Sequence, residues 1–319
     1  MNGEQILNFD FYALAEITRF GVPIFLMISG ALLLNRDIDL NSFFKKKFIR
    51  LVYPFLFFLI IHVIVLYPSA FNLFGYNWYF WMIVGVYLAI PLINKLIQNL
   101  SSKELDYFVA LIFVSSIIYQ LFYYFQIQSF LDLGFFIGPI SYLILGYYLS
   151  KKEFNRFSTN KIITICLLVF LMVTLLKIFG VLGVVPHSLA VNFKPTNTDI
   201  TLSWLDVGVL ELIQTASVFV LFKYLYKSTS SIYCGVKGIL QKNIVNKFIV
   251  SVSRASYGMY LINRTLMLFC DYNIVNLSLT GKQMVMCFII LTVSIFFVSW
   301  IIIVILSKIP FINKFSGYA

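Results

Sequence analysis

Long apolar segments recur along the whole chain, each close to 20 residues and separated by short polar stretches. A helix needs about 20 mainly apolar residues to cross the hydrocarbon core of a bilayer. Of the 319 residues, 61% are hydrophobic and only 12% are charged, which leaves too little polar surface to cover a water-soluble globule. The sequence therefore predicts an integral membrane protein.

We expect an all-α polytopic membrane protein of about nine transmembrane helices in one bundle. No repeat or soluble domain interrupts the pattern, so we expect a single membrane domain over residues 1–319. The predicted spans lie at about residues 11–34, 48–68, 76–98, 105–125, 132–150, 160–180, 207–226, 247–271 and 283–307.

Basic residues predict how these helices are oriented. Short cytoplasmic loops carry an excess of Lys and Arg, and 18 of the 24 basic residues fall on one side of the predicted membrane. Only Lys194 and Lys282 fall on the other side. This asymmetry places the C-terminus in the cytoplasm and the N-terminus outside.

An outside N-terminus carries a further expectation. Residues 1–10 contain no signal peptide that would deliver them across the membrane. We therefore expect one more helix before residue 1, and we expect the chain to be inactive without it.

The composition also limits which ligands and partners the chain is expected to bind. The four cysteines are scattered without a CxxC pair or nearby histidines, so no metal site and no disulfide framework is predicted. The net charge of +11 comes from basic residues that punctuate apolar runs. Nucleic-acid binders cluster such residues on exposed polar faces, so we expect membrane lipid and no nucleic acid as a partner.

Two places within the predicted helices are candidates for a functional site. Glu16 and Arg19 are i, i+3 neighbours in the first helix and can pair, either as part of a functional site or as a structural ion pair. His62 lies in the second helix, where it is either a packed, hydrogen-bonded residue or a general base.

Four cations precede or begin the second predicted helix. Lys45, Lys46, Lys47 and Arg50 either anchor the topology against anionic lipid or bind the phosphates of a cytoplasmic acyl donor. Both interpretations stay open on spacing alone.

Five segments in order resemble membrane acyltransferase family 3. They are RFGVPIFLMISGALLL at 19–34, FKKKFIRLVYP at 44–54, the segment 78–92 that begins WYF and ends YLAIPL, YLILGYYL at 142–149 and SRASYGMYLI at 253–262. The resemblance covers nearly the whole chain.

This resemblance implies a function. Members of the family O-acylate bacterial surface polysaccharides in the inner membrane, passing an acyl group, usually acetyl, from cytoplasmic acyl-CoA (acetyl-CoA) to a sugar hydroxyl. By resemblance the acceptor is a surface glycan or lipid-linked sugar. Donor or acceptor contacts would come from Arg19, Glu16, Lys45, Lys46, Lys47, Arg50, Asn77, Trp78, Tyr257 and Asn263.

The chain departs from the family pattern at its histidines. The family's catalytic His lies in a helix before the residues that match here. Asn77 precedes Trp78 where relatives often have His, and Asn263 replaces another His. An amide can hydrogen-bond a sugar but cannot exchange a proton near neutral pH. The competing hypotheses are therefore a glycan polymerase, a lipid-linked-sugar transporter, and a degenerate, non-catalytic relative.

The predicted orientation has a direct test. Cys234 should face the cytoplasm and Cys270 should lie near the outer face, because the flanking Lys counts differ sharply. A membrane-impermeant maleimide applied to intact cells should leave Cys234 unlabelled. Labelling of Cys234 in intact cells would reverse the orientation.

Overall fold

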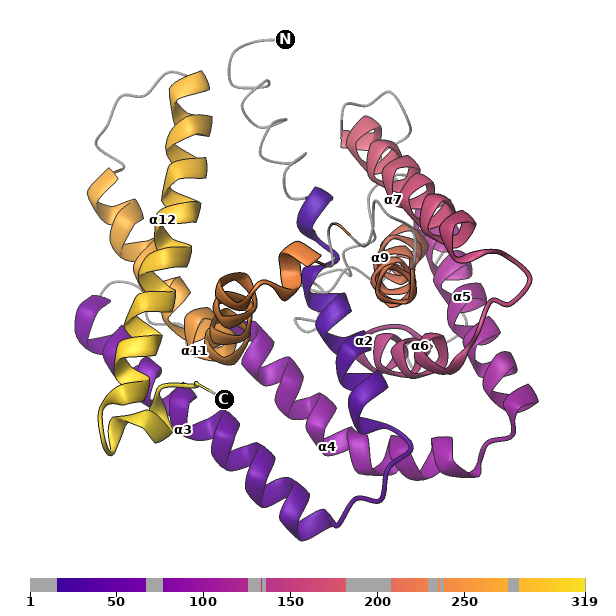
Figure 1. Cartoon of the computed structure of the whole chain (residues 1–319), viewed down its shortest axis with the longest axis horizontal. Coiled ribbons are helices and arrows are strands. Elements are labelled where there is room, and N and C mark those ends of the chain that lie inside the picture. Colours follow the sequence, from indigo (N-terminus) through magenta and orange to yellow (C-terminus); the bar gives the residue numbers. More distant parts are fainter. Residues whose placement is uncertain are drawn as a thin grey trace. The chain divides into compact units, whose positions relative to one another are not determined.

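The computed structural model describes residues 16–66, 77–125, 133, 136–181, 208–228, 235, 238–274 and 281–318. Helices dominate this part of the chain and it contains no strand, which confirms the predicted all-α class. The longer elements are α2 (Gly21–Leu33), α3 (Leu40–Leu66), α4 (Trp78–Asn99), α5 (Ser102–Tyr124), α6 (Pro139–Lys151), α7 (Thr159–Val181), α9 (Val209–Lys227), α11 (Asn243–Ile274), α12 (Gly281–Lys308) and the short 3-10 helix η2 (Ile312–Phe315) (Figure 1).

Seven helical stretches of the described residues are long and apolar enough to cross a membrane. They are Glu16–Leu33, Leu40–Val65, Trp78–Asn99, Ser102–Phe122, Thr159–Ile178, Val209–Lys227 and Met286–Lys308. Each predicted span contains a helix, but the predicted count of nine spans is not confirmed.

The two remaining helices show why the count differs. Helix α6 has 13 residues, which is about 20 Å at 1.5 Å per residue, while the hydrocarbon core is about 30 Å thick. It begins late because Gly138, with φ of 114°, precedes Pro139, and a residue before proline disfavours helix. Helix α11 is long, but Arg254 and Arg264 interrupt its apolar character.

The described helices group into two compact units. The first unit holds α3, α4 up to Tyr87, α11, α12 and η2, and the second holds α2, α4 from Leu88, α5, α6, α7 and α9. Cys270 is half-buried on α11 in the first unit, and Cys234 lies outside the described residues. The single domain over residues 1–319 and the orientation of the termini stay predictions.

Two glycines join α2 and α6 in the second unit (Figure 1). A Cβ at Gly30 would overlap the carbonyl oxygen of Leu143, and one at Gly146 would overlap that of Met27. Small residues allow membrane helices to approach to backbone contact. Because Met27 and Leu143 are fully buried at this crossing, the close approach also completes the core.

Lys223 of α9 closes the end of α6 in the same unit. Its ammonium donates to carbonyls that a helix end leaves without intrahelical partners, those of Leu149, Ser150 and Lys152. Hydrogen bonds from Lys227 and Lys223 lower the pKa of Glu153 from 4.5 to about 2. The pairing of Glu153 with these two lysines therefore stabilises the fold above pH 4.5, and its contribution to the free energy of unfolding is lost as the pH falls toward 2.

The first unit is packed by aromatic rings and one long-range hydrogen bond. Phe55 of α3 stacks on Phe80 of α4, with centroids 3.6 Å apart. Tyr257 of α11 donates its hydroxyl hydrogen to the carbonyl oxygen of Leu51 at 2.7 Å. Pro54, three residues after Leu51, has no N–H and leaves the neighbouring carbonyl oxygen of Arg50 without its donor in the α3 ladder. Tyr257 therefore ties α11 to the irregular part of α3.

Gly30→Ala should destabilise the second unit, because the added methyl group must push α2 away from α6. Overpacking of this kind costs about 1–3 kcal/mol. Gly21→Ala is the matched control, since a Cβ there meets nothing within 4 Å. Thermal unfolding in detergent, followed by circular dichroism, should separate the two variants. Equal Tm values would contradict the packing role of Gly30.

Candidate functional site

A basic cavity of about 700 Å³ lies in the first unit. Three of its cations come from the N-terminal half of α3, where Lys46 and Arg50 are separated by one helical turn and share a face. The lining residues are Lys45, Lys46, Ile49, Arg50, Pro54, Asn313, Lys314, Gly317 and Tyr318. Three of the cations that the sequence analysis grouped, Lys45, Lys46 and Arg50, line this cavity together.

A narrower cavity of about 190 Å³ shares Arg50 and Gly317 with the basic cavity. Its remaining lining residues are Lys47, Leu51, Tyr79, Ile83, Tyr87 and Tyr257. The ammonium of Lys47 lies 5.7 Å from the ring centroid of Tyr87, within cation–π range. We call this the tyrosine cavity. Its rings offer stacking surface and hydroxyl groups beside two cations.

The cations of these cavities have no internal counter-charge in the described part of the chain. No carboxylate there pairs with Lys45, Lys46, Lys47 or Arg50. Clustered cations repel one another unless an anion lies between them. The arrangement suits an anionic ligand with several charged oxygens, such as a phosphorylated molecule.

His62 lies elsewhere in the first unit and lines neither cavity. Its Nδ1 is 2.9 Å from Oγ1 of Thr265 on α11, and the side chain is buried. This geometry matches the interpretation of His62 as a packed, hydrogen-bonded residue.

Asn77 and Asn263, which the resemblance implies occupy positions of histidines, also lie outside these linings. Asn77 is buried, donates to the carbonyl oxygen of Leu261 at 3.4 Å and has φ of 51°. Asn tolerates this left-handed conformation better than most residues, and Trp78 begins α4 directly after it. Asn263 is half-buried on α11. Asn77 therefore has a structural place at the start of α4, where it holds the left-handed backbone conformation before the helix.

A buried ion network lies in the second unit. The ammonium of Lys177 on α7 is 2.9 Å from Glu16 and 2.5 Å from Glu211 of α9, and it donates to Gln214 at 3.1 Å. The predicted pair of Glu16 and Arg19 is present at 3.0 Å. Two carboxylates thus face two cations, which balances the charge of the network.

Sequence reasoning missed Lys177, Glu211 and the two tyrosines Tyr79 and Tyr87. A signal for the first two was present, because ionisable residues inside apolar spans are rare and pair with one another. Their partners lie far apart in the chain, so spacing cannot pair them. The tyrosines carried no signal, since Tyr occurs 20 times and suits membrane interfaces as well as ligands.

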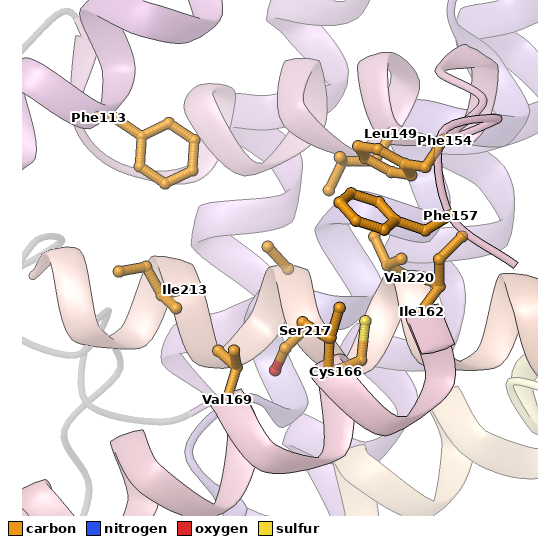
Figure 2. A pocket seen from close by; sticks show the side chains of 12 residues that line it. Phe113, Leu149, Phe154, Phe157, Ile162, Cys166, Val169, Ile213, Ser217 and Val220 are labelled. Atoms are coloured by element: carbon orange, nitrogen blue, oxygen red, sulfur yellow. The ribbon is translucent and has the colours of Figure 1, made fainter. Parts of the chain in front are cut away.

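An apolar cavity of about 330 Å³ also lies in the second unit. Figure 2 shows Phe154 and Phe157 above it, with Cys166 and Ser217 at its lower edge. The full lining is Phe113, Leu149, Phe154, Phe157, Ile162, Ile165, Cys166, Val169, Ile213, Ala216, Ser217 and Val220. Such a lining suits a hydrocarbon chain and offers no charged partner to a sugar or a phosphate.

Comparison with known families decides the class of the protein. A family model described as an acyltransferase domain, that of acyltransferase family 3, matches residues 2–304. The chain belongs to acyltransferase family 3. Comparisons with curated proteins and with solved structures gave no match.

Membership of acyltransferase family 3 confirms the resemblance carried by the five sequence segments. The protein is accordingly a membrane acyltransferase, with helices suited to crossing a bilayer. Of the residues that the resemblance implied, the first unit brings Lys45, Lys46, Lys47, Arg50 and Tyr257 together around the two cavities.

In this family 3 acyltransferase, Lys177→Met should destabilise the second unit strongly. Removing one partner of a buried ion pair leaves buried charge uncompensated and costs about 3–5 kcal/mol. Lys152→Met is the control, because Lys152 pairs with Asp106 at 3.0 Å on the exposed surface, where such pairs contribute little. Thermal unfolding in detergent should show a Tm below that of the wild type for Lys177→Met and an unchanged Tm for Lys152→Met. A Tm for this variant equal to that of Lys152→Met would contradict the structural role of the network.

Proposed function

We propose that this acyltransferase moves an acyl group, most simply acetyl, from acyl-CoA to a sugar hydroxyl of a bacterial surface polysaccharide or its lipid-linked precursor. The basic cavity binds the donor on the cytoplasmic side of the inner membrane. The observation that carries the proposal is the set of cations around the cavity that lack a carboxylate partner among the described residues.

The two cavities match the two ends of such a donor. The phosphates of CoA need cations, which Lys45, Lys46 and Arg50 supply. The thioester end is small and weakly polar, which suits the tyrosine cavity with its volume of about 190 Å³. Because Arg50 lines both cavities, one molecule can reach from the first to the second.

The reaction transfers one acyl group and one proton. The sugar oxygen attacks the thioester carbonyl carbon, a C–O bond forms, the C–S bond breaks, and CoA leaves as a thiolate that takes up a proton. A positioned base that removes the hydroxyl proton contributes about 10² to 10⁴ in rate. The Lys and Arg side chains of the cavities bind and orient the donor.

The family match supports the acyltransferase over the glycan polymerase and the lipid-linked-sugar transporter. The degenerate relative differs from an active enzyme in one measurable property, the transfer of labelled acyl groups to glycan. The same measurement therefore tests the proposed function directly.

Membranes of a deletion strain should lose transfer of radiolabelled acetyl from acetyl-CoA to surface glycan, and the wild-type gene should restore it. Arg50→Ala should raise the acetyl-CoA concentration that half-saturates transfer, since a charge-assisted hydrogen bond contributes about 1.5–3 kcal/mol. Lys103→Ala removes a cation that lines neither cavity and should behave as wild type. Unchanged glycan acylation in the deletion strain would refute the proposed function. An unchanged half-saturating concentration in Arg50→Ala would return the cations to the role of a topology anchor.

A further inference from the structure

The chain folds back after α12 toward the basic cavity. Helix α12 ends at Lys308, and η2 follows after a turn. Phe311 before η2 and Gly317 after it both have left-handed backbone conformations, with φ of 69° and 71°. These two residues redirect the chain, and η2 contacts both α12 and α3. We call residues 309–318 the C-terminal segment.

Two glycines hold the C-terminal segment against α11. A Cβ on Gly317 would lie 2.8 Å from Cα of Gly258, and a Cβ on Gly258 would overlap the carbonyl oxygen of Ser316, which is fully buried. The ring of Phe315 stacks on Tyr53 of α3, with centroids 5.7 Å apart and 26° between the planes. The segment is therefore a packed part of the first unit, with contacts to α3, α11 and α12.

This packing adds polar groups to the basic cavity. Asn313, Lys314 and Tyr318 line it together with Lys45 and Arg50. Lys314 is exposed, and in the part of the chain that the structure describes it pairs with no carboxylate. A further cation on this cavity adds repulsion to the empty site and attraction to an anion within it.

The C-terminal segment lies beyond the residues that match the acyltransferase family, which end at 304. The basic cavity thus combines cations of the matched region with one cation from outside it.

We propose that Lys314 is a further donor-binding residue that pairs with a phosphate of the acyl-CoA donor, and that the contact between Gly258 and Gly317 positions it. This inference rests on the proposed function. CoA carries a pyrophosphate and a ribose phosphate, and these separated charges match cations from two distant parts of the chain. An anionic lipid headgroup offers similar phosphate chemistry, so the experiment has an arm for each source.

Binding of CoA to the purified full chain in detergent, measured by titration calorimetry, tests the proposal. Lys314→Ala should weaken CoA binding about tenfold, and Lys314→Arg should restore most of the affinity. Lys308→Ala is the matched control, because Lys308 is an exposed cation close by in sequence that lines neither cavity. Pantetheine, which has no phosphate, should show no difference between wild type and Lys314→Ala.

Gly317→Ala tests the positioning of the lysine. It should weaken CoA binding although Lys314 is retained, because the added methyl group must push the C-terminal segment off α11 and strains a left-handed residue. Gly85→Ala, where a Cβ meets nothing within 4 Å, should bind CoA as wild type does. The Tm of each variant, measured in parallel, separates local displacement from global unfolding.

The outcomes separate this inference from the proposed function. If wild type binds CoA and Arg50→Ala weakens it while Lys314→Ala matches Lys308→Ala, the role of Lys314 is refuted and the donor site stands. Absence of CoA binding by wild type would overturn the donor site and Lys314 together. Weaker binding of phosphatidylglycerol nanodiscs by Lys314→Ala, with CoA affinity unchanged, would assign Lys314 to lipid and refute its donor role.

Discussion

Charge within an apolar helix bundle has to be neutralised, and the two units meet this constraint differently. In the second unit, Lys177 forms buried ion pairs with Glu16 and Glu211. In the first unit, Lys45, Lys46 and Arg50 line a cavity and no carboxylate of the described residues pairs with them. Such a cavity becomes electrostatically favourable when an anion enters. This contrast supports a structural role for the ion network and is the basis on which we propose donor binding in the basic cavity.

Glycines allow close backbone contact in both units, but the segments that they bring together differ. Gly30 and Gly146 bring two helices together, which is the usual use of small residues in membranes. Gly258 and Gly317 instead bring a chain end onto a helix and so complete one wall of the basic cavity. A Cβ at any of these positions meets backbone atoms, and backbone atoms cannot move aside as a flexible side chain does. Close helix packing in one unit and the position of the C-terminal segment in the other therefore both depend on glycine at a backbone contact.

Much of the fold could be predicted because hydropathy acts locally. Each predicted span contains a helix, since an apolar run of membrane length satisfies its backbone polar groups only by forming one. The length of α6 could not be predicted from hydropathy, because the apolar run continues through Gly138 and Pro139 while the helix begins only at Pro139. The pair of Glu16 and Arg19 was predicted because i, i+3 spacing on a helix fixes proximity. The cations of α3 were predicted as a group for the same reason.

The sequence by itself determined the membrane class, the approximate places of the helices, the family and the row of cations that begins α3. Only the tertiary structure decided which of these residues meet. His62 lies beside Thr265, 203 residues away, and Lys314 joins a cavity whose other cations are at the opposite end of the chain. The physical reason is that local patterns specify which face of a helix is apolar or charged, whereas the contacts between faces depend on how distant helices pack. In this protein the ion network, the tyrosine cavity and the position of Lys314 all arise from such contacts.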